Sequence, residues 1–454
     1  MTNKQTYKSR IKNFYKLPLD VKYKIVHKRY NFISKKEYES LANKKNSTRD
    51  TNLMIENSMG FFSMPIGIVL NFIVNNKPVI IPLVVEEPSI IAACSGVAYL
   101  VGKSGGVYAR SSSSIMIGQI NLLNIEKVYK SKLILNINKS NIKKIINNVS
   151  KNMVKRGGGC QYLTCKILYM SKDTIHTQYD SKKPSLIIHF YVNCCNAMGA
   201  NIVNTILENV TYRIKNLLKC DCGIRIISNF STKRMAKAYC SIPYSQLSNQ
   251  ASESHGIWIA KNIISAYRMS IRDVYRACTH NKGIMNGVDA VAIATGNDWR
   301  ALESAAHTFA SRGSMYTSLT IYVMCKDSLA CYIEMPLSAA TVGGSTSALN
   351  SIKSKRKILG VFSSTSKHLS EVMIAVGLCQ NIAALKALST SGIQKGHMLL
   401  HAKQISSSIK CSYVELKYLT YKLVKNNNVN FYYSNVYLYK LKLKKETKPN
   451  NVFI

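Results

Sequence analysis

A lysine and an aspartate lie at the two ends of one apolar run in the second half of the chain. Lys282 stands among glycine and asparagine residues, the run Val288–Thr295 follows, and Asp298 comes next in a second Gly/Asn turn. The run has the length and composition of a buried strand, and the turn residues let backbone approach a ligand. Either residue alone is more often simply solvated. Together they predict a catalytic arrangement in which Lys282 and Asp298 occupy loops at the ends of a strand.

The adjacent carboxylates Glu86 and Glu87 end another apolar stretch, immediately before Pro88. Neighbouring side chains on a strand diverge, so one of the two can point inward. Burial raises the pKa of a carboxyl group and a nearby lysine lowers it, which makes an inward carboxylate tunable as a proton donor near neutral pH. Taken alone, such a pair more often marks a solvated strand end.

His397 and His401 are four residues apart and share one face if the segment is helical. Zinc needs a third ligand, and the pattern His-Glu-x-x-His is absent because Met398 occupies the glutamate position. Proton transfer by one histidine is therefore favoured. The thirteen cysteines show no zinc spacing either, so we expect no metal and interpret them as reduced thiols of a cytosolic protein.

The turn Asn196–Gly199 introduces a predicted helix, and free N–H groups at a helix N-terminus can hold phosphate. The Rossmann fingerprint Gly-x-Gly-x-x-Gly does not occur in the sequence. A dinucleotide bound here would therefore use a different fold.

The 454 residues should form two or three domains. A Lys-rich helical arm is expected up to about residue 50, and the last forty or so residues show little periodicity. Helices are predicted at Asn141–Val154, Ala200–Leu217, Ile257–Tyr267, Trp299–Ser311 and Leu369–Thr390, and strands at Tyr162–Met170, Ser185–Val192, Gly223–Ser228, Ser318–Met324 and Leu329–Glu334. The middle of the chain is thus predicted as an α+β domain inserted into a larger one.

The net charge of +40 would attract polyanions. The lysines are nevertheless spread among asparagine and isoleucine, which favours compositional drift over a nucleic-acid-binding face. Phe61–Val74 is too short to span a membrane, and Val79–Val101 carries Glu86 and Glu87 at its centre. No signal peptide is recognised. We therefore expect a cytoplasmic protein without nucleic-acid or membrane partners.

Together these segments resemble the class II (soluble, prokaryotic-type) hydroxymethylglutaryl-CoA (HMG-CoA) reductases from about residue 13 to about residue 408. The motifs stand in the family's order, which leaves little room for coincidence. They are Glu56–Gly60, Val84–Ser89, Ala197–Asn201, Arg276–Asn286, Ala294–Arg300, Glu334–Pro336, Thr341–Gly344, Val376–Asn381 and Gly392–Met398.

The resemblance implies a four-electron reduction of HMG-CoA to mevalonate and CoA by two nicotinamide hydrides, for isoprenoid biosynthesis. It assigns Lys282 to the thioester carbonyl and its oxyanion. Glu87 would protonate or polarise that carbonyl, Asp298 would hold the Lys/Glu hydrogen-bond network, and His397 would protonate the departing CoA thiolate. Arg276 would bind the substrate's free carboxylate. The remaining substrate contacts would be Ser89, Asn286, Gln380 and Asn381.

The dinucleotide is expected at Asn196, Ala197, Met198, Gly199, Ala200 and Asn201. The family usually has Asp where Asn196 stands, so one cofactor contact is altered. Members that use NADH carry an acidic residue shortly before the triple glycine, whereas this chain has Ser150 and Lys151 there. A hydroxyl and a cation suit a 2′-phosphate, which favours NADPH over NADH.

The implied fold class is α+β. A large, mainly helical substrate domain (1–120 and 232–392) is interrupted by a small α+β, ferredoxin-like and non-Rossmann cofactor domain (121–231). A C-terminal flap and tail (393–454) follow and carry His397. Members are homodimers or higher oligomers of dimers with active sites at the interface, where Glu56 and Asn57 are candidate contributors.

Two alternatives stay open. The same fold could degrade mevalonate oxidatively with NAD and CoA, and only cofactor preference and metabolic context separate this from synthesis. A basic nucleic-acid-binding protein on a decayed scaffold would bind any duplex in a salt-sensitive way without turnover. Retention of Glu87, Lys282, Asp298 and His397 speaks against decay.

Overall fold

The structure, a computed structural model, describes most of the chain beyond residue 61. The described residues are 11, 14–18, 21–22, 24–25, 56–57, 62–169, 184–248, 250–344, 350–390, 392–409 and 411–446. Most of the predicted N-terminal arm lies outside them, apart from pieces such as the 3₁₀ turn η1 (Phe14–Lys16). The side chain of His397 also lies outside them, although its backbone is described.

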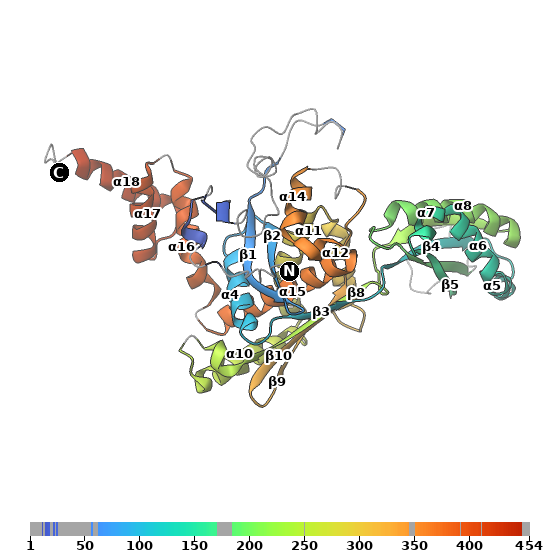
Figure 1. The fold of residues 1–454 in the computed structure, drawn as a ribbon, viewed down its shortest axis with the longest axis horizontal. Coiled ribbons are helices and arrows are strands. Elements are labelled where there is room, and N and C mark those ends of the chain that lie inside the picture. The colour runs from blue at the N-terminus through green and yellow to red at the C-terminus, as the bar shows by residue number, and fades with distance from the viewer. Residues whose placement is uncertain are drawn as a thin grey trace, which may run out of the picture.

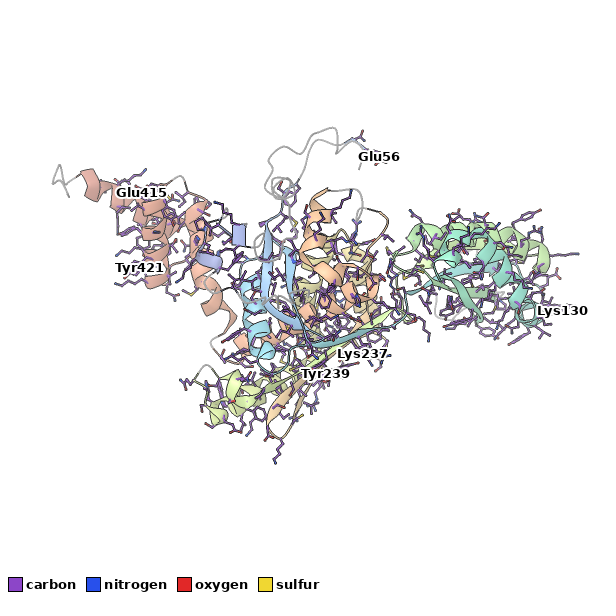
Figure 2. All side chains as sticks on the ribbon, viewed as in Figure 1. Glu56, Lys130, Lys237, Tyr239, Glu415 and Tyr421 are labelled. Atoms are coloured by element: carbon purple, nitrogen blue, oxygen red, sulfur yellow. The ribbon has the colours of Figure 1, made fainter. Side chains whose placement is uncertain are left out.

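The larger hydrophobic core packs helices against two antiparallel sheets. The hairpin β1 (Ile66–Val74) and β2 (Lys77–Val84) forms one sheet, and the other has the order β3 (Tyr108–Ser111), β8 (Met235–Pro243), β10 (Ser328–Pro336), β9 (Thr320–Met324). Alternate residues of β8 are buried, so that Lys237 and Tyr239 are exposed in Figure 2. This alternation is typical of a sheet with one face on the core and one in water.

The helices of this core include two long ones that pack directly against each other. They are α11 (Val274–Thr295) and α15 (Ser366–Leu388), surrounded by α4 (Ile90–Gly102), α9 (Tyr244–Leu247), α10 (Glu253–Ser270), α12 (Trp299–Ala310), α14 (Asn350–Ile358) and η2 (Gly360–Ser363). Among the described helices only α15 is long and apolar enough to cross a membrane, and 78% of its apolar window is buried inside the protein. Such burial identifies α15 as a core helix.

The predicted strand at Val288–Thr295 is wrong, because these residues form the last turns of α11. A short apolar run cannot be assigned to strand or helix by periodicity alone. Nor is Gly287 a turn residue: a Cβ on it would lie 3.0 Å from Val376 Cγ1 on α15. This glycine therefore serves close helix–helix packing, and Lys282 lies in the middle of a helix.

A second, separate core lies at one end of the molecule (Figure 1). Its antiparallel sheet has the order β5 (Gly159–Leu168), β6 (Ser185–Asn193), β4 (Ile115–Leu123), β7 (Asp221–Ser228). Its helices are α5 (Val128–Ile137), α6 (Lys139–Val149), α7 (Lys151–Lys155) and α8 (Ala200–Leu218). The helix predicted at Asn141–Val154 is thus interrupted at Ser150. Apart from this helix and the run Val288–Thr295, the helices and strands predicted with bounds are confirmed within a few residues.

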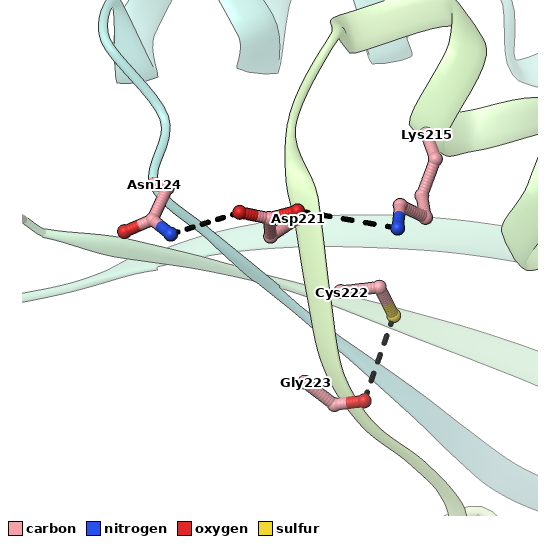
Figure 3. Close-up of polar contacts among 5 residues, drawn as sticks. All are labelled: Asn124, Lys215, Asp221, Cys222 and Gly223. Atoms are coloured by element: carbon pink, nitrogen blue, oxygen red, sulfur yellow. Dashed lines mark hydrogen bonds and ion pairs between the residues drawn. The ribbon is translucent and has the colours of Figure 1, made fainter.

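Side-chain contacts tie the edge strand β7 to its neighbours (Figure 3). Asp221 accepts a hydrogen bond from Asn124 Nδ2 at 2.9 Å and forms an ion pair with Lys215 Nζ of α8 at 4.0 Å. Both partners are largely exposed, so the ion pair adds little stability. The register at the start of this strand is that of the backbone pairing of Asp221 with Leu123 on β4.

The C-terminal part lies at the opposite end from the second core (Figure 1) and is helical. It comprises α16 (Ile393–Ser407), α17 (Tyr413–Lys425) and α18 (Phe431–Glu446). Ser412 and Glu415 form a capping box at the start of α17, which is a strong helix-initiating pattern. The low periodicity of this tail therefore did not reveal its helices. Few of its residues are buried apolar side chains, such as Leu419 and Leu423 of α17, and they stand among many tyrosines and lysines.

Candidate functional site

Glu87 and Lys282 meet through their charged atoms. Glu87 lies in the loop after β2, and Lys282 reaches it from the middle of α11, with Nζ 3.0 Å from Glu87 Oε2. Asn286, one helical turn beyond Lys282, donates to the same oxygen at 3.4 Å. Glu86 is exposed. The inward member of the carboxylate pair is therefore Glu87, held between an ammonium group and an amide.

These three residues line a cavity of about 580 Å³. That volume suits a small-molecule ligand. Residues 282, 286, 289 and 293 recur at helical spacing, so α11 supplies one wall of the cavity. The lining residues are Met64, Val84, Val85, Glu86, Glu87, Lys282, Asn286, Asp289, Ala290, Ile293, Gly296, Asn297, Trp299 and Ile352.

Asp289 is a cavity residue that the sequence analysis missed. Its Oδ1 is buried and has no hydrogen-bond partner among the residues that the structure describes. Burial, with a hydrogen bond and repulsion from Glu303, raises the pKa of Asp289 to about 8. The sequence feature that could have identified Asp289 is its position seven residues after Lys282. That spacing places the two side chains on one face, but only if the segment is a helix.

Asp298 lies beside the cavity, at the N-cap of α12. Its Oδ1 accepts from the backbone N–H of Ala301 at 3.1 Å, and Arg300 Nε lies 4.0 Å away. Its neighbours Asn297 and Trp299 line the cavity. Within the part of the chain that the structure describes, Asp298 makes no hydrogen bond to Lys282 or Glu87, so its predicted place in their network stays a prediction.

Two of the predicted substrate residues keep a buried oxygen without a partner. Ser89 precedes α4 in a left-handed conformation, with φ of 74°. Within the described ranges, the hydroxyl of Ser89 and Oε1 of Gln380 are buried and have no hydrogen-bond partner. A buried oxygen without a hydrogen bond is costly, so both atoms could accept or share a proton from a bound ligand.

Asn381 instead belongs to a polar network behind α11. Its Oδ1 accepts from the Tyr322 hydroxyl at 2.6 Å, and its Nδ2 donates to the His280 carbonyl at 3.2 Å. His280 Nε2 lies 2.6 Å from Thr320 Oγ1. Burial, assisted by the charge of Arg276, lowers the pKa of His280 to about 3. This neutral network fixes the helix that carries Lys282.

Arg276 and the two histidines belong to other parts of the fold than the cavity-lining residues that the structure describes. Arg276 is in the first turn of α11, its pKa is lowered by burial, and it does not line the cavity. His397 and the exposed His401 both belong to α16. This confirms that the segment carrying the two histidines is helical. Across the described residues, no group of three His, Cys, Asp or Glu side chains could hold a metal ion.

The turn predicted to meet the dinucleotide leads into α8 and is anchored to the larger core. Asn196 Oδ1 accepts from the Ser366 N–H at the start of α15 at 3.0 Å, and its carbonyl accepts from the Thr341 N–H at 2.9 Å. Gly199 has φ of 105°, and a Cβ on it would lie 2.3 Å from Cys194 Sγ. The glycine is thus required, and the side chain of Asn196 caps α15.

Ser150 and Lys151 differ in their surroundings. Ser150 is buried, with 3% of its surface exposed, and its hydroxyl donates to the Ile146 carbonyl at 3.0 Å. Lys151 is exposed at the start of α7. The cation is therefore accessible to a ligand, while the hydroxyl is used within the helix.

Comparison with known proteins matches the same segments. The family model described as hydroxymethylglutaryl-coenzyme A reductase matches residues 19–402. The chain is 34% identical over 435 residues to 3-hydroxy-3-methylglutaryl-coenzyme A reductase of Archaeoglobus fulgidus, covering 96% of this chain and 95% of that protein. It is 32% identical over 399 residues to the probable 3-hydroxy-3-methylglutaryl-coenzyme A reductase of Borreliella burgdorferi, covering 87% and 88%.

Solved structures agree with this relationship. The class II reductase of Streptococcus pneumoniae bound to NADPH in open conformations has a TM-score of 0.76 and 32% identity, over 94% of this chain and all of that one (100%). A second structure of a reductase from that organism has a TM-score of 0.78 and 31% identity, over 95% and 99%. The sequence match, the shared mixed helix and sheet fold and the order of the motifs lead to one conclusion: the chain belongs to the hydroxymethylglutaryl-CoA reductase family, in its class II, prokaryotic-type branch.

Proposed function

We propose that the cavity around Glu87 and Lys282 is where this oxidoreductase reduces HMG-CoA to mevalonate. The observation that carries the assignment is the 3.0 Å contact between the two side chains at the cavity wall. Lys282 would stabilise negative charge that develops on the thioester oxygen. Glu87, in contact with the ammonium group, can exchange a proton with it and deliver one to the same oxygen. Asn286 orients Glu87 by donating to its Oε2.

The other assignments extend this site. Ser89 and Gln380 offer unpaired buried oxygens to the substrate, whereas Asn381 acts by holding α11. Arg276 would bind the substrate carboxylate, Asp298 would complete the acid–base network, and His397 would protonate the CoA thiolate. The enzyme is proposed to act as a cytoplasmic homodimer, with a large substrate domain (1–120 and 232–392), a small ferredoxin-like cofactor domain (121–231) and a C-terminal flap (393–454).

A nicotinamide dinucleotide fits the turn at Asn196–Asn201. Gly199, the N-cap of α8, has no side chain that could accept a hydrogen bond from the first N–H groups of the helix. These N–H groups can therefore donate to a phosphate. Each bound NAD(P)H would supply one hydride, so two cofactor molecules bound in succession would supply the two hydrides of the reduction. Lys151 gives the second core an exposed cation for a 2′-phosphate, and the related reductase of Streptococcus pneumoniae is described as bound to NADPH. We therefore favour NADPH over NADH.

The test is the loss of reduced-nicotinamide absorbance on mixing purified protein with HMG-CoA, using NADPH and NADH at equal concentration. Turnover that requires HMG-CoA and is faster with NADPH supports the whole proposal. Faster turnover with NADH rejects the cofactor preference alone. Folded, dimeric protein without turnover from either cofactor would reject the proposed site.

A further inference from the structure

Arg234 is a buried cation that links the second core to the larger one. It lies between β7 and β8, where the chain returns to the larger core, and is 3% exposed. Its Nη1 donates to the carbonyls of Ala197 at 3.0 Å and Met198 at 3.2 Å, and its Nη2 donates to the carbonyl of Ala339. One guanidinium group therefore holds two loops that are far apart in the sequence.

The partners of Arg234 are neutral. Over the described ranges, no carboxylate lies within ion-pair distance of its guanidinium group. Burial lowers the pKa of Arg234 to about 10, so the group still carries its charge at neutral pH. A buried charge without a counter-ion is costly even when hydrogen-bonded. A neutral amide could join the same carbonyls at lower cost, so the charge itself requires an explanation.

Two of the three carbonyls that Arg234 binds, those of Ala197 and Met198, immediately precede the N-terminus of α8. Met198 leads into Gly199, whose left-handed backbone turns the chain into the helix. Other contacts support the same turn, including the parallel bridge between Ala197 and Val342. By binding the carbonyls of Ala197 and Met198, Arg234 fixes the backbone of the turn, and this also fixes the direction of the N–H groups in the first turn of α8. An anion at this helix end would also feel the positive charge behind the turn.

We propose that Arg234 is a positioning residue for the nicotinamide dinucleotide. It orients the N-terminus of α8 through Ala197 and Met198 and supplies the counter-charge that the phosphates of the dinucleotide meet, without touching the cofactor. This inference rests on the proposed function, because it takes the anion bound at this turn to be that cofactor. Loss of Arg234 should therefore weaken dinucleotide binding more than HMG-CoA binding.

The experiment compares Arg234→Met and Arg234→Lys with Arg225→Met in the full-length protein. Arg225 is an exposed arginine on β7, so its substitution controls for loss of one positive charge from the same unit. The dissociation constant of NADPH is measured by nicotinamide fluorescence, KM for HMG-CoA and kcat by absorbance, and Tm by circular dichroism. Arg234→Met should raise the dissociation constant of NADPH about tenfold or more, while KM for HMG-CoA changes less than about twofold.

Arg234→Lys retains the charge but loses the fork that spans three carbonyls, so it should recover part of the NADPH affinity. Arg225→Met should bind NADPH like the parent protein. Equal loss of affinity for both substrates, in proportion to the fall in Tm, would assign Arg234 a general structural role and overturn the inference. Parent protein that binds no dinucleotide would reject the proposed function instead.

Hydrogen exchange on the parent protein tests the same inference if both variants misfold. Arg234 joins Ala197 and Met198 to Ala339, in addition to the backbone contacts of residues 196 and 197 with residues 341 and 342. NADPH should therefore slow amide exchange in residues 196–202 and 339–342 together. Protection confined to residues 196–202 would show that the two loops are not coupled through Arg234, and would overturn the proposal.

Discussion

Glu87 and Lys282 are 195 residues apart in the sequence, yet their Oε2 and Nζ atoms lie 3.0 Å apart. The contact requires the loop after β2 to meet the middle of α11. Helix α11 is fixed there from behind by α15 and by the buried network of His280, Thr320 and Asn381. The site thus depends on packing that is remote from its chemistry.

Removing either member of this pair should abolish most of the activity. In Lys282→Ala the developing oxyanion loses its cation, and in Glu87→Gln the carboxyl group can no longer transfer a proton. We expect kcat for HMG-CoA reduction to fall about 100-fold or more in each case, with little change in Tm because the ion pair is partly exposed. Glu253→Gln changes an exposed carboxylate on α10 that does not line the cavity and should keep near-parental kcat. Comparable losses in Glu253→Gln would contradict the assignment.

Close packing of α11 on α15 predicts a strong effect at Gly377. A Cβ on this residue would lie 2.9 Å from Val288 Cγ2, so Gly377→Val must push the two helices apart. We expect a loss of about 1–3 kcal/mol in the free energy of unfolding, measured with urea. The control is Gly283→Ala on α11, where a Cβ meets nothing within 4 Å. Alanine should be neutral or stabilising there, and an equal loss in both variants would contradict the packing argument.

Gly287, which also lies where α11 packs against α15, shows where sequence reasoning failed. Gly287 and its asparagine neighbours suggested turns, and Val288–Thr295 suggested a strand, because local composition does not reveal that a second helix packs against the segment. The sequence nevertheless singled out Glu87 and Lys282, which the structure brings into contact, because motif order is independent of secondary structure. Asp289 and Arg234 were missed because their significance comes from burial, and in a chain with 62 lysines and arginines a single arginine carries no signal.

The exposed cation at the start of α7 predicts cofactor selectivity. Replacing Lys151 by Asp should repel a 2′-phosphate and accept hydrogen bonds from a ribose hydroxyl. We expect the ratio of kcat/KM for NADPH to that for NADH to fall about tenfold or more. Lys130→Asp is the matched control, because Lys130 is an exposed lysine on α5 of the same core (Figure 2). An unchanged ratio in Lys151→Asp would remove the basis for preferring NADPH at this position.

Asp289 predicts a pH dependence of stability. The folded protein raises the pKa of this carboxyl group from 3.8 to about 8. Between these values the unfolded chain has lost the proton and the folded protein keeps it, so the folded state binds more protons. The free energy of unfolding therefore decreases as pH rises through this window, and the decrease stops above the folded pKa.

Asp289→Asn keeps the shape of the side chain and removes the titration. The Tm of the variant relative to the parent should therefore increase steadily from about pH 5 to about pH 8. Thermal unfolding followed by circular dichroism across this range gives the comparison, and Glu126→Gln, at an exposed carboxylate, should show no such trend. A Tm difference that is constant with pH, or that declines as pH rises, would mean that Asp289 is ionised in the folded protein. In that case burial and the neighbouring Glu303 do not keep the proton on Asp289.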